Sequence, residues 1–79
     1  MADSNAWARK LILGHARSFA APDVERSEDL RAVADWFART YEGTNSFVRD
    51  MQRWVMAGRS LTSSQARGVL NVARVELAR

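Results

Sequence analysis

His15 is the only histidine in this 79-residue chain and the residue type most readily associated with catalysis or metal binding. A general base needs a second group to orient it and a pocket for its substrate, and the sequence recommends neither. The carboxylates available to complete a metal site are Glu25, Glu28 and Asp29. They lack ligand-like spacing and suit the first turns of a helix, where they complement the helix dipole. We therefore interpret His15 as a partly buried or interfacial imidazole beside Ile12 and Phe19, and we expect no metal and no cofactor.

Other reactive motifs are missing from the sequence. There is no glycine-rich phosphate loop and no nucleophile elbow, and the absence of cysteine excludes disulfides and zinc-thiolate sites. One cluster of hydroxyl groups comprises Ser60, Thr62, Ser63 and Ser64. Because Thr62-x-x-Gln65 matches a capping box, we interpret this cluster as turn and cap chemistry, with an anion site at the helix N-terminus as the alternative. We expect that the protein is not an enzyme.

The positive charge is concentrated in the second half of the chain. Residues 1–43 carry six cations and seven anions (6 − 7 = −1), whereas residues 44–79 carry six cations and two anions (6 − 2 = +4). Arginine suits bidentate contacts with phosphates or carboxylates, so nucleic acid or an acidic protein surface is the expected partner. A merely solvated basic face is the alternative. The candidate contact residues are Arg49, Arg53, Arg67, Asn71 and Arg74.

Four helices must position these side chains. Apolar residues recur at intervals of three and four over residues 5–20, 27–42, 45–57 and 63–78, and the second helix begins at residue 23 if an earlier turn joins it. Pro22 is expected to stop the first helix, and Gly58, in a left-handed conformation, to end the third. The chain shows neither strand-like alternation nor a linker. It is therefore predicted to be one all-α domain, residues 1–79, built as a small bundle of about four helices.

Two of these helices carry more apolar surface than a single contact needs. The helix over residues 63–78 has a second stripe of Gly68, Val72 and Val75 opposite its main one, and the helix over residues 5–20 has apolar residues over half its circumference. The expected protein-interface residues are Trp7, Leu13, Trp36, Gly68, Val72 and Val75. With the short length and the lack of disulfides, this surface predicts a homodimer.

Aromatic residues and helical glycines are expected to serve packing. Five of the seven aromatics, Phe47 among them, fall on apolar stripes, so we expect them in the core rather than stacked on bases; Trp36 and Trp7 are the candidates for exposure. Gly14 and Gly68 lie inside predicted helices, where each costs about 0.5–1 kcal/mol relative to alanine. We expect one or both at a tight contact between helices.

The sequence shows no sign of a membrane protein. No apolar segment approaches the roughly 20 residues that span a bilayer, and residues 1–5 lack the basic-then-apolar order of a secretory signal. We expect a cytoplasmic protein without membrane contact.

One segment resembles a known kind of protein. Asn45-x-Phe47-Val48, Gly58-x-x-Leu61-Thr62-x-x-Gln65-Ala66 and Val69-Leu70-Asn71 are similar to a helical hairpin of small phage and actinobacterial proteins, within residues 44–76. Similar hairpins occur beside phage replication and recombination enzymes. The resemblance implies an accessory protein of phage or prophage type and supplies no catalytic residue.

Two functions follow from these observations. The first is a non-enzymatic helical protein that acts on nucleic acid, or on a nucleic-acid-processing complex, through its arginine-rich C-terminal hairpin. The alternative is a protein-interaction module, either a phage factor that binds a host protein or a homo-oligomeric adaptor, without nucleic-acid contact. A helix-turn-helix that reads a DNA groove is disfavoured because Trp54 stands where that motif normally has a small residue.

Overall fold

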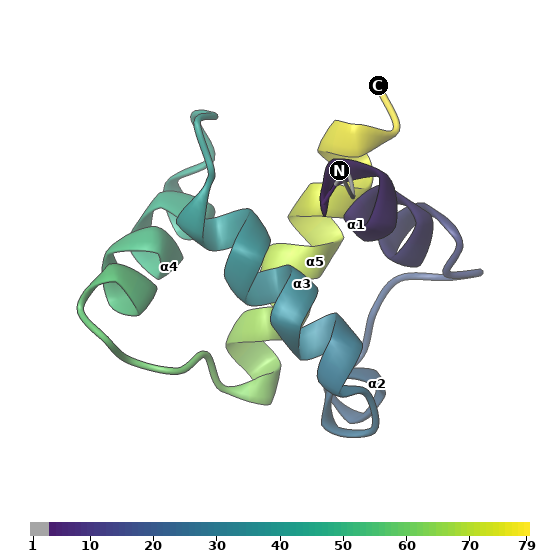
Figure 1. The fold of residues 1–79 in the computed structure, drawn as a ribbon, viewed down its shortest axis with the longest axis horizontal. Helices are drawn as coiled ribbons and strands as arrows, with labels where there is room; N and C mark the ends of the chain where they lie inside the picture. Colours follow the sequence, from purple (N-terminus) through teal and green to yellow (C-terminus); the bar gives the residue numbers. More distant parts are fainter. Residues whose placement is uncertain (1–3) are drawn as a thin grey trace.

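The computed structural model describes residues 4–79, which form five helices and, over this range, no strand (Figure 1). The helices are α1 (Ser4–Leu13), α2 (Ala21–Glu25), α3 (Glu28–Arg39), α4 (Ser46–Met56) and α5 (Ser63–Leu77). The predicted all-α class is confirmed, with a short fifth helix, α2, added to the four expected. Residues 1–3, part of the segment expected to lack a secretory signal, lie outside the described residues.

The centre of the fold is the pair α3 and α5, which pack together more extensively than any other two helices. Figure 1 shows α4 on one side of this pair, with α1 and α2 on the other. The largest fully buried side chains are Ile12, Val24, Val33, Val48, Val55, Val69 and Leu70. Since every helix contributes at least one of them, a single apolar core joins all five helices.

Local sequence signals fix where the later helices begin. Ser27, Asn45 and Thr62 precede α3, α4 and α5, and the side chain of each accepts a hydrogen bond from a backbone amide of the first turn. At α5 the capping box is complete, because the amide of Thr62 also donates to the Gln65 side chain at 2.9 Å. Gly58 has a φ of 87°, the left-handed conformation expected after α4.

The helix predicted over residues 5–20 is wrong beyond Leu13. The amide of Gly14 closes the last turn of α1 on the carbonyl of Lys10, and residues 14–20 form an irregular connector. Gly14 is therefore a helix-end residue and not a helix-crossing site: a Cβ there would lie 2.6 Å from the Lys10 oxygen.

A side chain distant in the sequence explains the irregular connector. Asn71 of α5 accepts from the Phe19 amide at 2.7 Å and donates to the Phe19 carbonyl at 3.1 Å. An interior helical residue would have used both of these backbone groups within its own helix. The connector therefore delivers the Phe19 ring to the core from an extended segment.

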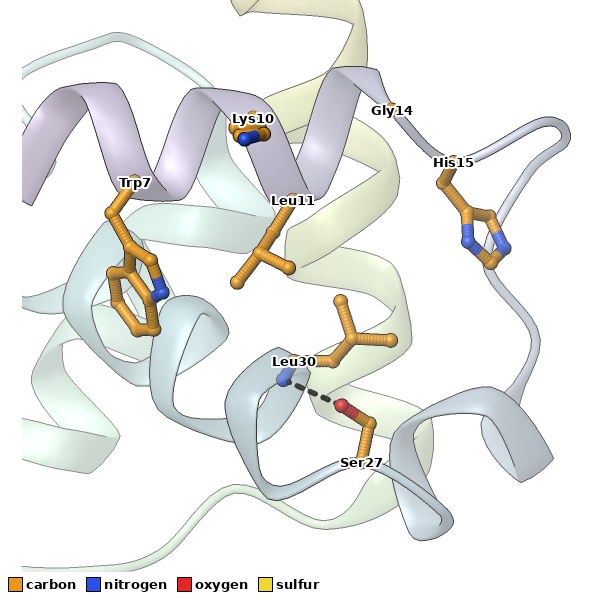
Figure 2. Close-up of a pocket in the computed structure, with 7 residues that line it drawn as sticks. All are labelled: Trp7, Lys10, Leu11, Gly14, His15, Ser27 and Leu30. Atoms are coloured by element: carbon orange, nitrogen blue, oxygen red, sulfur yellow. Dashed lines mark hydrogen bonds between the residues drawn. The ribbon is translucent and has the colours of Figure 1, made fainter.

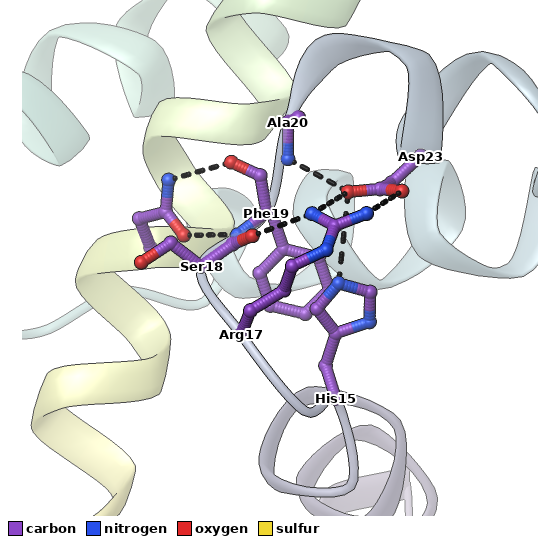
Figure 3. Close-up of polar contacts among 7 residues, drawn as sticks. His15, Arg17, Ser18, Phe19, Ala20 and Asp23 are labelled. Carbon is purple, nitrogen blue, oxygen red and sulfur yellow. Dashed lines mark hydrogen bonds and ion pairs between the residues drawn. The ribbon is translucent and has the colours of Figure 1, made fainter.

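Pro22 begins a helix where it was expected to end one. It lies in the first turn of α2, where its missing N–H leaves no hydrogen bond unmade. Asp23 accepts from the Ala20 amide at 2.9 Å and receives two bonds from Arg17, at 3.0 and 3.1 Å (Figure 3). The Ala20 amide, followed by the Arg17 guanidinium, lowers the pKa of Asp23 below its usual value of 3.8.

The second predicted helix is divided and shorter than expected. Arg26 and Ser27 separate α2 from α3, and α3 ends at Arg39 instead of Glu42. The chain turns there because Tyr41 folds back: its hydroxyl donates to Glu76 at 2.7 Å and accepts from the Asn45 amide at 3.0 Å. Burial, and then the bond to Glu76, raises the pKa of Tyr41 above its usual value of 10.0. The 40–45 turn is thereby tied to both α4 and α5.

Replacement of Asn71 by alanine tests the long-range tie to Phe19. The N71A variant leaves a part-buried amide and carbonyl without their partners, so we expect the free energy of unfolding to fall by about 1–3 kcal/mol. Urea denaturation followed by circular dichroism measures this change. Ser64→Ala, at an exposed position of the same helix, is the control and should shift stability by no more than about 0.5 kcal/mol. Equal stabilities of the two variants would contradict the assignment.

The lowered pKa of Asp23 predicts a pH dependence of stability. The stabilisation due to ionised Asp23 is fully present above its unfolded-state pKa and is lost as the pH falls through its lower folded-state value. The difference in urea midpoint between wild type and Asp23→Asn should therefore be largest near neutral pH and shrink below about pH 4. A difference that stays constant from pH 6 to pH 2 would refute this role.

Candidate binding surface

The five predicted contact residues occupy two helices but do not form one cluster. Arg53 on α4 forms an ion pair with Asp50 of its own helix. Arg49 lies one turn before Gln52, whose side chain donates to the Tyr41 carbonyl at 2.9 Å, so Arg49 lies on the side of α4 that faces the 40–45 turn. Arg67, Asn71 and Arg74 project from α5. The basic surface is therefore divided between two edges.

Asn71 has a structural task at the connector. Because its side-chain oxygen and nitrogen both bond to the backbone of Phe19, reading a base edge would require breaking that contact. The same contact weakens the groove-reading alternative. Trp54, the residue that argues against a helix-turn-helix, donates from Nε1 to the Ser60 carbonyl at 2.8 Å and so supports the connector between α4 and α5.

Two successive hollows follow the flank of α5 that faces the start of α4, and we call them together the α4–α5 groove. The first has a volume of about 380 Å³ and is lined by Phe47, Ser64, Gln65, Arg67 and Gly68. The second, of about 310 Å³, is lined by Asn45, Asn71, Val72, Val75, Glu76 and Arg79. Gly68 and Val72 lie one helical turn apart, so the hollows succeed one another along the helix. The groove combines apolar walls with arginines at its borders.

Phe47 is partly exposed, and its expected place in the core is wrong. The side chain is 38% exposed and forms one wall of the first hollow. Gly68 explains this position, because a Cβ on Gly68 would lie 2.7 Å from Cε2 and Cζ of the ring. The edge of the ring thus lies against the backbone of α5. The tight contact expected at Gly68 is confirmed, and it joins α4 to α5.

Arginine pairing differs between the two halves of the chain. In the first half, Arg17 and Arg39 pair with Asp23 and Asp35, and Arg9 and Arg31 donate to carbonyls of the C-terminal half. In the second half, Arg53 has Asp50 and Arg59 lies over the Trp54 ring at 4.7 Å. Within residues 4–79, the arginines without a side-chain hydrogen bond or ion pair are Arg26 in the first half and Arg49, Arg59, Arg67, Arg74 and Arg79 in the second. Uncompensated positive charge therefore accumulates on α4 and α5.

Sequence patterns did not single out Phe47 or Arg79 as part of a site. Arg79 lies four positions after Val75, a spacing that would have placed it on the second apolar stripe. Phe47 gave no such signal, because a helical wheel cannot show whether the neighbouring helix offers a side chain or a glycine.

The expected interface residues of the first half lie in a different region. Trp7 is 44% exposed and Leu13 is also exposed, whereas Trp36, the residue most expected at the surface, is half-buried against the core. Among the residues of the second stripe, Val75 is 57% exposed, and Gly68 and Val72 are half-buried. The unpartnered apolar surface is therefore split between α1 and the α4–α5 groove.

A groove of about 450 Å³ separates α1 from the start of α3 (Figure 2). The side chains of Trp7 and Leu11 point from α1 toward Leu30. Trp7 and His15 lie at opposite ends of the groove. The His15 ring stacks on Phe19 with centroids 4.1 Å apart. His15 Nε2 is buried, has no hydrogen-bond partner among residues 4–79, and lies 3.6 Å from a carboxylate oxygen of Asp23.

The groove between α1 and α3 is an apolar contact surface, because Trp7, Leu11 and Leu30 line it. The carboxylate nearest His15 is already bonded to Arg17 and to the Ala20 amide. Within the described residues, no three histidine or acidic side chains come close enough to hold a metal ion, and no helix is long and apolar enough to cross a membrane. His15 itself is half-buried, as expected, but it lies in the connector and not on a helix.

Comparison with protein-family models, with curated proteins and with solved structures finds no match to this chain.

Substitution of Gly68 tests the contact that shapes the α4–α5 groove. In Gly68→Ala the new methyl group displaces the Phe47 ring, while the gain in helix propensity of about 1 kcal/mol opposes the lost contact. We expect a folded protein whose unfolding free energy changes by less than about 1 kcal/mol and whose Phe47 ring resonances shift in NMR spectra. Unchanged ring resonances would show that Phe47 does not rest on Gly68.

Proposed function

We propose that this chain is a non-enzymatic helical protein that binds nucleic acid through α4 and α5. It would act in the cytoplasm as an accessory protein of the phage or prophage type that its C-terminal hairpin resembles. The observation that carries the proposal is the asymmetry of arginine pairing: the second half keeps Arg49, Arg67, Arg74 and Arg79 without an acidic partner in the described residues. Guanidinium groups with no internal partner are available for phosphates.

The shape of the surface supports the same proposal. Arg67 and Arg79 border successive hollows of one groove, so phosphates of a single chain can follow the flank of α5. Glu76, the only acid lining the groove, is engaged by the Tyr41 hydroxyl. Arg49 and Arg74 add positive charge at the two edges and strengthen the attraction over a Debye length.

A protein-interaction module is the second candidate, and a specific observation favours it. Trp7 and Leu13 are exposed on α1, and Val75 is exposed on α5, so apolar surface remains on two separate faces. A homodimer or a host protein would cover one of them. This candidate predicts association that depends little on salt.

Salt titration with arginine variants tests nucleic-acid binding. The dissociation constant for a fluorescent oligonucleotide, measured by anisotropy, should rise steeply with salt; Arg67→Gln should weaken binding and reduce the slope of log K against log salt by about 0.7–0.9. Arg39→Gln is the control of equal charge change, because Arg39 pairs with Asp35 on α3, and its slope should match the wild type. The absence of binding to single-stranded DNA, duplex DNA and RNA at low salt would eliminate this function.

A further inference from the structure

We propose that the first hollow of the α4–α5 groove holds one unstacked nucleobase against the Phe47 ring, so that the protein prefers single strands to duplexes. This inference rests on the proposed function and names the form of nucleic acid that the groove takes.

The position of the Phe47 ring is set by its contact with Gly68. Phe47 lies with its Cε2–Cζ edge against Gly68 and forms a wall of a hollow of about 380 Å³. An aromatic ring fixed by a backbone contact presents π surface to a base at a small cost in side-chain entropy. A partly exposed aromatic beside a basic groove is the arrangement by which single-strand binders stack bases.

The charge of the hollow matches one nucleotide. Arg67 is the only charged residue among those that line it, and Arg67 has no ion-pair partner within residues 4–79. Of the remaining lining residues, Ser64 offers its hydroxyl to the edge of a base, and Gln65 offers its Nε2 amide, because its Oε1 already accepts from the Thr62 amide. An apolar wall, one guanidinium and no carboxylate suit a base with its phosphate better than an acidic peptide, which would place its charge on the single arginine and leave the hollow unfilled.

The hollow distinguishes single strands from duplexes for a simple reason. The faces of paired bases are covered by their neighbours in the stack, and exposing one costs a few kcal/mol. A single strand offers base faces without that cost. Duplex DNA would therefore reach Arg67 with its phosphates while leaving Phe47 without a partner.

The test separates stacking from phosphate binding with three probes of equal length. These are a fluorescent single-stranded oligothymidylate, the same sugar-phosphate chain without its bases, and a duplex. Wild type should bind the oligothymidylate about 5- to 150-fold more tightly than the abasic chain, the range that one stacked base supplies. Phe47→Leu should reduce oligothymidylate affinity to that of the abasic chain and leave abasic binding unchanged, because leucine keeps apolar contact without a π face.

Companion variants exclude a folding artefact. Phe47→Trp should retain the preference for bases, Gly68→Ala should lose most of it because the ring is displaced, and Met56→Leu, an exposed apolar control on α4, should behave as wild type. Circular dichroism melts confirm that each variant is folded. Oligothymidylate and abasic binding of equal strength in wild type would overturn the stacking site and leave phosphate-driven binding standing. No binding of any probe at low salt would overturn the proposed function itself.

Discussion

The two hydrogen bonds between the Asn71 side chain and the Phe19 backbone join segments 52 residues apart, and the arrangement of the first half of the chain depends on them. They fix the Phe19 end of the irregular connector 14–20, so that Phe19 enters the core and α1 and α2 can both contact α5. His15 stacks on the ring that is thus fixed, and Asp23 with Arg17 closes the other end of the connector. Without cysteine, a chain of this size relies on such contacts to close a long loop.

The different numbers of acidic residues in the two halves explain where unpaired positive charge remains. The first half has nearly equal numbers of acids and cations, and four of its five arginines donate side-chain hydrogen bonds within the fold: Arg31, for example, donates to the Leu61 carbonyl and to Ser63 at the start of α5. The second half has two acids: Asp50 pairs with Arg53, and Glu76 accepts a hydrogen bond from the Tyr41 hydroxyl. Four further arginines of this half, Arg49, Arg67, Arg74 and Arg79, form no ion pair within residues 4–79.

Elements that depend on neighbouring residues could be predicted from the sequence, and those that depend on distant contacts could not. The caps at Asn45 and Thr62 and the left-handed Gly58 involve groups three or four residues apart, and the predicted bounds of α4 and α5 hold to within a residue. The course of the connector at Phe19 and the early end of α3 involve Asn71 and Glu76, both of which lie on α5. Helical periodicity carries no information about such partners, and it extended both helices too far.

The candidate groove shows this limit at the level of a single residue pair. On a helical wheel Phe47 belongs to the apolar face of α4, and Gly68 is only a residue of low helix propensity in α5. Their meeting changes both roles: with no side chain at residue 68, the ring lies on the helix surface, remains 38% exposed and leaves a hollow beside Arg67. A larger residue at position 68 would fill the place where the edge of the ring now rests. Glycine at position 68 lowers helix propensity, but it lets the Phe47 ring form an aromatic wall beside Arg67. The shape of this candidate surface therefore depends on a contact between α4 and α5 that neither helix predicts alone.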